Sequence, residues 1–209
     1  MSFYGVAQRL VRWLWPLVGG RLEVEGLDHI PGAGPFLLIA NHQSYLDPIL
    51  IQAVVPRPMY TMAKSTEFSN PVVGGFLKRL KSFPVRRFQI DPQAVRIVLR
   101  HLEAGRGVGI YVEGERTWDG RLQAPRLGTL RLLLKAGVPV IPCGISGAYD
   151  VWPRWHRRIR RGTIRIRFGE PARLPQLDDR RERDAALPET RERLMSALAC
   201  LSGAGRADG

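Results

Sequence analysis

The residues best placed to do chemistry are His42 and Asp47, in the stretch 41–47 with the sequence NHQSYLD. The apolar run 36–40 directly before them is typical of a buried strand, and ligands of open α/β sheets lie beyond the carboxyl ends of strands. Five helical positions rotate by about 140°, so His42 and Asp47 meet only if His42 lies in the turn before a helix. The pair Asp47-Pro48 favours that arrangement, with Asp47 as N-cap and Pro48 as first helical residue. A histidine oriented by a carboxylate could then serve as a general base.

The alternative is that Asp47 only caps a helix and His42 is an ordinary turn residue, because a short motif has a high false-positive risk. The other turns decide between the two interpretations. A charged residue follows each of the expected strands 59–63, 82–85 and 108–112. These residues are Lys64, Arg86, Arg87, Glu113 and Arg116. If the strands are mostly parallel, all of them gather at one sheet edge, and several cations beside a His-carboxylate pair favour a phosphorylated substrate that is deprotonated nearby.

The composition points to an anionic partner. The 209 residues suit one α/β domain with a sizeable core, and the formal net charge of +13 comes mainly from arginine, whose planar fork suits phosphate. Nucleic acid, an anionic membrane surface and a phosphorylated small substrate all remain candidates, since charge alone does not choose among them. The only cysteines, Cys143 and Cys200, are too few for a disulfide framework, which favours a reducing compartment and cytoplasmic exposure.

Expected strands alternate with expected helices along most of the chain. This pattern predicts a single α/β domain with a central, mostly parallel or mixed sheet flanked by helices. Further strands are expected at 21–25, 138–143 and 163–168. Helices are expected at 48–55, at 71–80 after the cap Asn70, at 92–104 between the cap Asp91 and Gly105, at 128–136 and at 188–201. Prolines in 138–143 favour an edge strand or a strand end. We place the boundaries at residues 1–20 for an N-terminal amphipathic helix, 21–202 for the domain and 203–209 for a disordered tail.

Two segments combine aromatic with basic residues. Residues 3–18 are apolar and tryptophan-rich with Arg9 and Arg12 between, so this helix either lies in a membrane interface or packs on the core of the domain. No run approaches the ~18 apolar residues that a membrane-spanning helix needs, and nothing resembles a signal-peptide cleavage site. Residues 152–161 have the same character, which favours a membrane-facing patch over a nucleic-acid surface. His29, His101 and His156 show no metal-ligand spacing.

The charged blocks, taken in order, resemble those of the 1-acylglycerol-3-phosphate acyltransferase family, the lysophosphatidate acyltransferase or PlsC-like group. Residues 41–47 match its NHxSxxD block, and 83–87 (FPVRR), 113–117 (EGERT) and 138–142 (VPVIP) are similar to the next three. In this chain Arg86 replaces the usual acidic residue of the second block. Val112 stands for the customary proline and Glu115 for the customary threonine of the EGTR block.

The resemblance implies a role for each matching position. His42 would be the catalytic base and Asp47 would orient it. Substrate-binding residues would be Asn41, Ser44, Lys64, Arg86, Arg87, Glu113, Gly114 and Arg116. Residues of the acyl side would be Val138, Pro139, Ile141 and Pro142.

The resemblance also implies a glycerolphosphate acyltransferase-like fold and an O-acyltransferase on the cytoplasmic face of a membrane, peripheral or monotopic. It would move an acyl group from acyl-CoA or acyl carrier protein to a lysophospholipid, most readily 1-acylglycerol-3-phosphate, without metal, cofactor or nucleic acid. The alternatives are another lysophospholipid or a membrane glycolipid as acceptor. A different class is a non-catalytic basic protein that binds membrane or nucleic acid.

Overall fold

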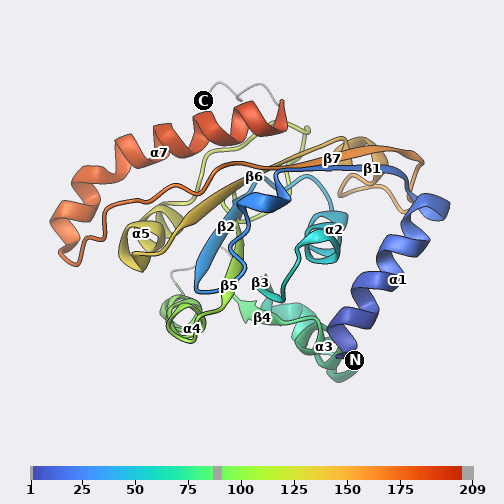
Figure 1. Cartoon of the computed structure of the whole chain (residues 1–209), viewed down its shortest axis with the longest axis horizontal. Coiled ribbons are helices and arrows are strands. Elements are labelled where there is room, and N and C mark those ends of the chain that lie inside the picture. Colours follow the sequence, from blue (N-terminus) through green and yellow to red (C-terminus); the bar gives the residue numbers. More distant parts are fainter. Residues whose placement is uncertain (1, 87–90, 204–209) are drawn as a thin grey trace.

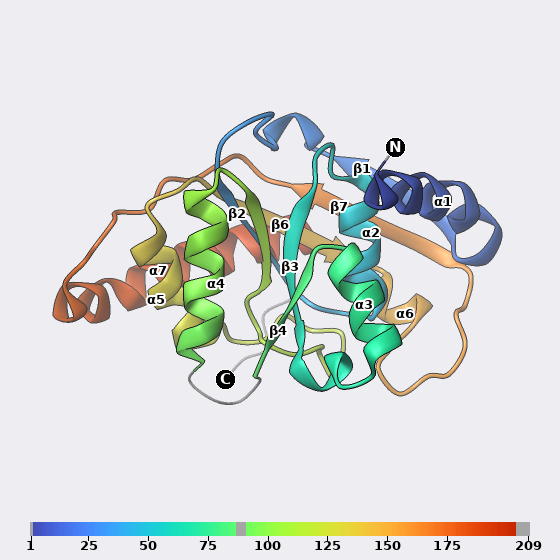
Figure 2. The ribbon, with the colours of Figure 1, turned by 90° about the horizontal axis from the view of Figure 1, so that it is seen from below.

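A seven-stranded sheet forms the centre of the protein, as seen in a computed structural model that describes residues 2–86 and 91–203 (Figures 1 and 2). The strand order is β1-β7-β6-β2-β5-β3-β4. Strands β2 to β6 run parallel, whereas β1 and β7 run parallel to each other and β7 pairs with β6 antiparallel. The strands are β1 (Gly20–Glu25), β2 (Phe36–Ala40), β3 (Met59–Lys64), β4 (Ser82–Val85), β5 (Gly107–Tyr111), β6 (Val140–Ser146) and β7 (Gly162–Phe168). The predicted α/β domain with a mostly parallel sheet is therefore confirmed.

Helices cover both faces of this sheet (Figure 1). The α-helices are α1 (Phe3–Val18), α2 (Leu46–Val54), α3 (Pro71–Arg79), α4 (Pro92–Glu103), α5 (Leu127–Ala136), α6 (Ala148–Val151) and α7 (Arg180–Ser202). Short 3₁₀ helices are η1 (Leu27–His29) and η2 (Ser65–Phe68). One apolar cluster joins the sheet to α1 and α2, and a second cluster joins its other face to α4, α5 and α7.

Strand β2 is buried on both faces, which explains its unbroken apolar sequence. Leu38 and Ala40 belong to the cluster with α1 and α2, whereas Leu37 and Ile39 belong to the cluster with α4, α5 and α7. Neighbours β5 and β6 pair with β2 on either side, and Ala40 lies opposite Tyr111 and Cys143. The residues after Ala40 therefore emerge at the middle of the sheet's carboxyl edge.

The sequence left open whether helix α1 packs on the core or lies in a membrane interface. One face of the helix packs on the core and the opposite face is exposed. Tyr4 and Trp15 are buried against the core, and the side chain of Gln8 donates to the carbonyls of Gln52 and Val55 at the end of α2. The opposite face leaves Trp13 70% exposed, with further apolar side chains around it. Within the described residues, no helix has the length and apolar character needed to cross a bilayer.

Two expectations about the second half of the chain are wrong. Strand β6 is internal, between β2 and β7, and not an edge strand, although Pro139 does lie at a strand end, directly before Val140. Pro142 is tolerated within β6 because it lies just past the last β7 partner. Its carbonyl accepts from Gly169, the residue after β7. Helix α7 begins at Arg180, so Pro188 lies inside it, because Asp179 caps it by accepting the N–H groups of Arg181 and Glu182. Of the expected tail 203–209, only Gly203 is among the described residues, and it caps α7.

Candidate active site

Asn41 fixes the direction in which the chain leaves β2. Its side-chain amide donates to the carbonyl of Ile145 at 2.9 Å and accepts the N–H of the same residue at 2.7 Å. Ile145 belongs to β6, the neighbouring strand, so this pair of bonds extends the sheet by one side chain. Asn41 is 2% exposed, and it holds the following histidine at the sheet edge.

His42 and Asp47 meet in the turn that follows. Nδ1 of His42 lies 2.7 Å from Oδ2 of Asp47, and that oxygen also accepts the N–H groups of Gln43 and Ser44 at 2.6 and 2.7 Å. Oδ2 acts as the acceptor for both N–H groups, so it also accepts from Nδ1 of His42, which carries the proton and donates it. Nε2 is then the ring nitrogen that can act as a base. Asp47 is fully buried, which makes its charge an effective partner for an imidazolium.

The expected N-cap role of Asp47 is wrong. Helix α2 begins at Leu46, one residue earlier, and the side-chain oxygen of Ser44 accepts the N–H of Leu46 at 3.2 Å. Asp47 instead accepts N–H groups from the turn before its own helix, because the chain folds back there tightly enough to direct three donors at one oxygen. His42 does lie in the turn before the helix, which was the condition for the two side chains to meet.

The imidazole of His42 is supported on one face by Tyr111, the last residue of β5. The ring centroids are 4.0 Å apart and the planes differ by 23°. Burial raises the pKa of Tyr111 well above its usual value, and the charges of Asp47 and Cys143 add to the rise, so its hydroxyl stays neutral. The stack restricts rotation of the histidine ring and leaves Asp47 to fix its tautomer.

The turn after β5 brings Glu113 against the same histidine. Oε1 of Glu113 accepts the N–H of His42 at 3.2 Å, and the N–H of Thr117 donates to the carbonyl of His42 at 2.8 Å. Gly114 has a φ of 75°, the left-handed conformation that glycine adopts without strain. The Glu113–Thr117 turn and the histidine turn are therefore joined into one unit.

Glu113 is 3% exposed and its ionisation is suppressed. Burial raises its pKa to about 8; the N–H of His42 opposes this rise and the charge of Asp47 adds to it. Glu113 is thus mostly protonated at neutral pH. Oε2 of Glu113 and Nη1 of Arg116 are both buried and have no hydrogen-bond partner within the described part of the chain. Such groups are costly unless a bound molecule satisfies them.

Arg116 is a cation within this turn. Its guanidinium carbon lies 3.3 Å from the centre of the Tyr45 ring, a cation–π contact, and that ring is 49% exposed at the start of α2. Arg116 forms no ion pair with any carboxylate of residues 2–86 and 91–203. Its charge is therefore available to an anion.

A comparison with protein families identifies the family to which the chain belongs. The family model described as Acyltransferase matches residues 21–146, which include all of the elements described so far in this section. The chain belongs to the Acyltransferase family. The resemblance inferred from the four sequence blocks is thereby confirmed at the level of the family.

Several named acyltransferases are similar to this chain. The 1-acyl-sn-glycerol-3-phosphate acyltransferase of Bacillus subtilis is 26% identical over 81% of this chain and 84% of its own length. A human enzyme of the same name, form alpha, is 28% identical over 74% of this chain, but this chain spans only 56% of it. The crystal structure of PlsC from Thermotoga maritima, a 1-acyl-sn-glycerophosphate acyltransferase, superposes with a TM-score of 0.76 at 24% identity, covering 99% of this chain and 81% of that one.

The remaining expected substrate-binding residues of this acyltransferase-family chain are spread along the same edge. Lys64 ends β3 and Arg86 follows β4, and both side chains are exposed. The two strands are parallel neighbours, so their carboxyl ends lie at the same edge of the sheet (Figure 2). The N–H of Arg86 donates to Asp91, the cap of α4. Arg87 lies outside the described residues. Ser44 is fully buried and donates to the carbonyl of Trp152 at 2.7 Å, so it braces the turn.

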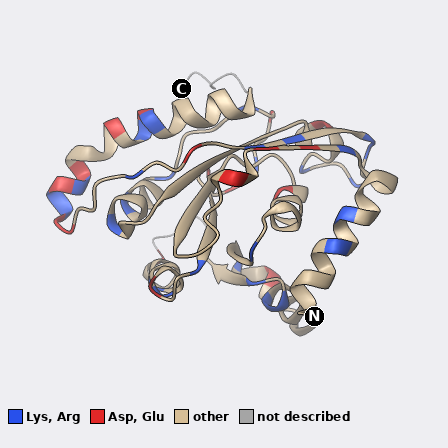
Figure 3. Ribbon diagram, viewed as in Figure 1, with Lys and Arg blue, Asp and Glu red and all other residues tan. Residues whose placement is uncertain are grey.

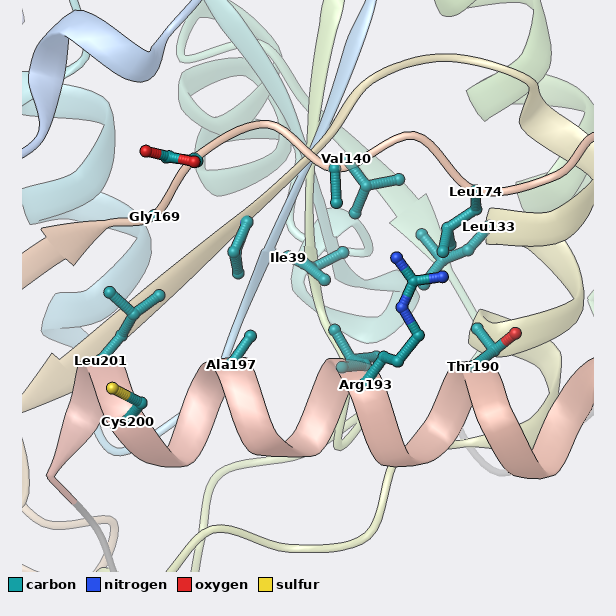
Figure 4. Close-up of a pocket in the computed structure, with 14 residues that line it drawn as sticks. Ile39, Leu133, Val140, Gly169, Leu174, Thr190, Arg193, Ala197, Cys200 and Leu201 are labelled. Carbon is teal, nitrogen blue, oxygen red and sulfur yellow. The ribbon is translucent and has the colours of Figure 1, made fainter.

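The structure does not bring the expected acyl-side residues to His42. Val138 and Pro139 precede β6 at the opposite edge of the sheet, and Ile141 is buried in the cluster with α1 and α2. Pro142 lines a cavity of about 350 Å³ between the sheet and α7 (Figure 4). Ile39 lines the same cavity, on the sheet face opposite to the cluster that contains α2.

Sequence reasoning missed three residues that shape this site: Tyr111, Arg126 and Arg154. Tyr111 could have been found, because it ends the strand that pairs with the histidine strand. Arg154 gives no local signal, since it binds a turn 38 residues earlier in the chain. Within the described ranges, no three His, Cys, Asp or Glu side chains gather as a metal site would require.

Proposed function

We propose that this acyltransferase-family protein moves an acyl group from a thioester to the free hydroxyl of 1-acylglycerol-3-phosphate, giving phosphatidic acid. The observation that carries the proposal is the His42–Asp47 pair, joined through the Glu113–Thr117 turn to an arginine that forms no ion pair in the described ranges. The names of the similar proteins from Bacillus subtilis and human support the choice of acceptor.

The chemistry follows from the acidity of the hydroxyl that attacks and of the thiol that leaves. A hydroxyl is a poor nucleophile near pH 7, whereas a thiolate with a pKa of about 8.5 is a good leaving group. His42 Nε2 takes the hydroxyl proton while the oxygen bonds to the thioester carbonyl carbon and the C–S bond then breaks. Asp47 stabilises the imidazolium, and the proton leaves with the thiol or with water. Such base catalysis typically contributes about 10² to 10⁴ in rate.

The acceptor phosphate would be held by the cations of the carboxyl edge. Arg116 supplies a charge from the turn that is hydrogen-bonded to His42, and Lys64, Arg86 and Arg87 complete the set proposed from the sequence. Protonated Glu113 can donate a hydrogen bond to an oxygen without repelling the phosphate. No resident cofactor is proposed; acyl-CoA or acyl carrier protein would be the co-substrate. Another lysophospholipid or a membrane glycolipid is the alternative acceptor.

A membrane surface would present the acceptor, and α1 is the element suited to meet it. Its outer face exposes Val6, Leu10, Trp13 and Leu17, and the helix holds two arginines and no acidic residue (Figure 3). Tryptophan and arginine beside aliphatic bulk are typical of helices in the bilayer interface. We place the protein on the cytoplasmic face, as a peripheral or monotopic protein.

The rival function, nucleic-acid binding by residues 152–161, is less well supported by the contacts. Trp152 is partly buried against the core and its Nε1 donates to the carbonyl of His156, so its ring is not available to stack on a base. Arg154 is bound to Glu115. Binding to oligonucleotides with a steep salt dependence and without liposome binding would favour the rival.

The deciding experiment is incubation of the purified protein with lysophosphatidate and either labelled acyl-CoA or acyl carrier protein. Formation of labelled phosphatidate is expected with at least one donor, and the His42→Ala variant is expected to lose it while remaining folded. Matched reactions use monoacylglycerol, which lacks the phosphate, and other lysophospholipids. Equal rates with monoacylglycerol, or full activity without His42, would refute the proposal.

A further inference from the structure

The Glu113–Thr117 turn is held from outside by two arginines that are distant in sequence. Arg126, just before α5, donates through Nε to the carbonyl of Glu113 at 3.0 Å. Arg154, after α6, donates through Nη1 to the carbonyl of Arg116 at 2.9 Å. The two arginines thus hold the carbonyl groups of Glu113 and Arg116 in the same short turn, and both of these are proposed substrate-binding residues.

Glu115 lies between them and binds both. Oε1 is 3.2 Å from Nη2 of Arg126, and Oε2 is 3.3 Å from Nη1 of Arg154. A threonine, the residue that the family resemblance leads one to expect here, has one hydroxyl and cannot reach two guanidinium groups. The carboxylate therefore links the two arginines into one bracket around the turn: Arg126, Glu115 and Arg154.

Packing makes the Arg154 side of this bracket rigid. The guanidinium carbon of Arg154 lies 3.4 Å from the ring centre of Trp118, and the Trp118 ring stacks on Trp155 with centroids 6.2 Å apart. The Arg154 side chain is only 19% exposed. A planar guanidinium between an aromatic face and two fixed oxygens has little rotational freedom.

The bracket also separates the charges of three neighbouring arginines. Glu115 pairs with both Arg126 and Arg154 and offsets one of their two positive charges, whereas the Arg116 guanidinium lies against the Tyr45 ring and keeps its charge for an anion. We infer that Glu115 and Arg154 are positioning residues, which hold the Glu113–Thr117 turn so that Arg116 meets the phosphate of the acceptor. This inference rests on the proposed function, because it takes the acceptor to be phosphorylated.

The test compares Glu115→Gln, Arg154→Gln and the double variant. Each single change is expected to raise the KM for lysophosphatidate by about threefold to tenfold, with kcat and the KM for the acyl donor unchanged. The double variant is expected to be no worse than the worse single variant, because both changes open the same bracket.

The chain offers a matched control in Glu23 on β1. Glu23 also bridges two arginines, Arg21 and Arg165, at 3.0 and 2.6 Å, and its side chain is 26% exposed against 27% for Glu115. Glu23→Gln and Arg165→Gln are expected to leave every kinetic constant unchanged. Thermal unfolding of all variants shows whether a change is only structural.

The Arg116→Gln variant distinguishes a wrong phosphate site from a wrong positioning role for Glu115 and Arg154. If it leaves the acceptor KM unchanged, the proposed phosphate site is wrong and the inference falls with it. If it raises the KM but the Glu115 and Arg154 variants do not, only the inference is wrong. A lower acceptor KM in Glu115→Gln would also overturn it, because the released arginines would then be binding the phosphate themselves.

Discussion

Replacing Asp47 by asparagine tests whether the charge of this side chain activates His42. Asparagine has nearly the same shape, and its carbonyl oxygen can still accept the N–H groups of Gln43 and Ser44 and the Nδ1 proton of His42. Its amide nitrogen would take the place of Oδ1, a buried atom without a hydrogen-bond partner in the described residues. We expect the protein to fold with a free energy of unfolding lower by about 1 to 3 kcal/mol.

The loss in rate can be worked from Coulomb's law. When His42 takes a proton, its positive charge lies about 4 Å from the carboxylate centre, and at an effective dielectric constant of about 20 their attraction is about 4 kcal/mol. Removing it slows the chemical step by up to about 10³, since each 1.4 kcal/mol is about tenfold. Single-turnover acyl transfer to lysophosphatidate at saturating acceptor measures this step directly.

The matched control is Asp179→Asn. Asp179 also accepts two backbone N–H groups, at the start of α7, but it lies in another element and contacts no histidine. Its variant is expected to keep the full rate. If folded Asp47→Asn transfers acyl groups within about tenfold of the parent, the charge of Asp47 does not drive catalysis, and the pair is only a structural hydrogen bond.

Three further predictions concern Glu113, α1 and the core. Because burial raises the pKa of Glu113 from 4.5 to about 8, the folded state binds the proton more tightly, so its contribution to stability is complete below about pH 4.5 and is lost as the pH rises to 8. Glu113→Gln, which stays neutral, should lose less stability between pH 5 and 8 in urea titrations; parallel curves would contradict the assignment. Leu10→Ser, Trp13→Ser and Leu17→Ser together should reduce co-sedimentation with anionic liposomes at unchanged melting temperature, and undiminished binding would place the membrane contact elsewhere. Leu50→Ala, at a side chain 1% exposed, should lower the free energy of unfolding by about 2 to 5 kcal/mol, whereas Val72→Ala, 79% exposed, should change it by less than about 0.5 kcal/mol.

The sequence predicted the central elements well because their signals are local. Strand β2 has five consecutive buried apolar residues, and the caps Asn70 and Asp91 each precede a proline that begins a helix. Whether an internal strand can contain a proline depends instead on where the neighbouring strand ends. For β6 that is the end of β7, more than twenty residues later, and no local pattern reports it.

The residues of the candidate site also differ in how well the sequence placed them. The turns that carry His42, Lys64, Arg86 and Glu113 were placed at one edge because parallel strands expose their carboxyl ends together. The four acyl-side positions were assigned from resemblance to a block, and the structure puts that block at the start of β6 and within it, away from the histidine. A block can match a family without its side chains reaching the chemistry.

The placement of Arg116 shows why tertiary contacts decide what a motif can do. Its neighbours in sequence give it a position in a turn, but the turn is held by Arg126 and Arg154, and only the folded chain brings these to Glu115. A glutamate at position 115 looks unfavourable for a phosphate site when the turn is considered alone, since it adds negative charge where an anion should bind. With both arginines bound to it, the negative charge of the same carboxylate is offset, and the proposed contact with the acceptor phosphate falls to Arg116. The departure from the family pattern at this position is therefore compatible with the proposed phosphate site, because this chain also has Arg126 and Arg154.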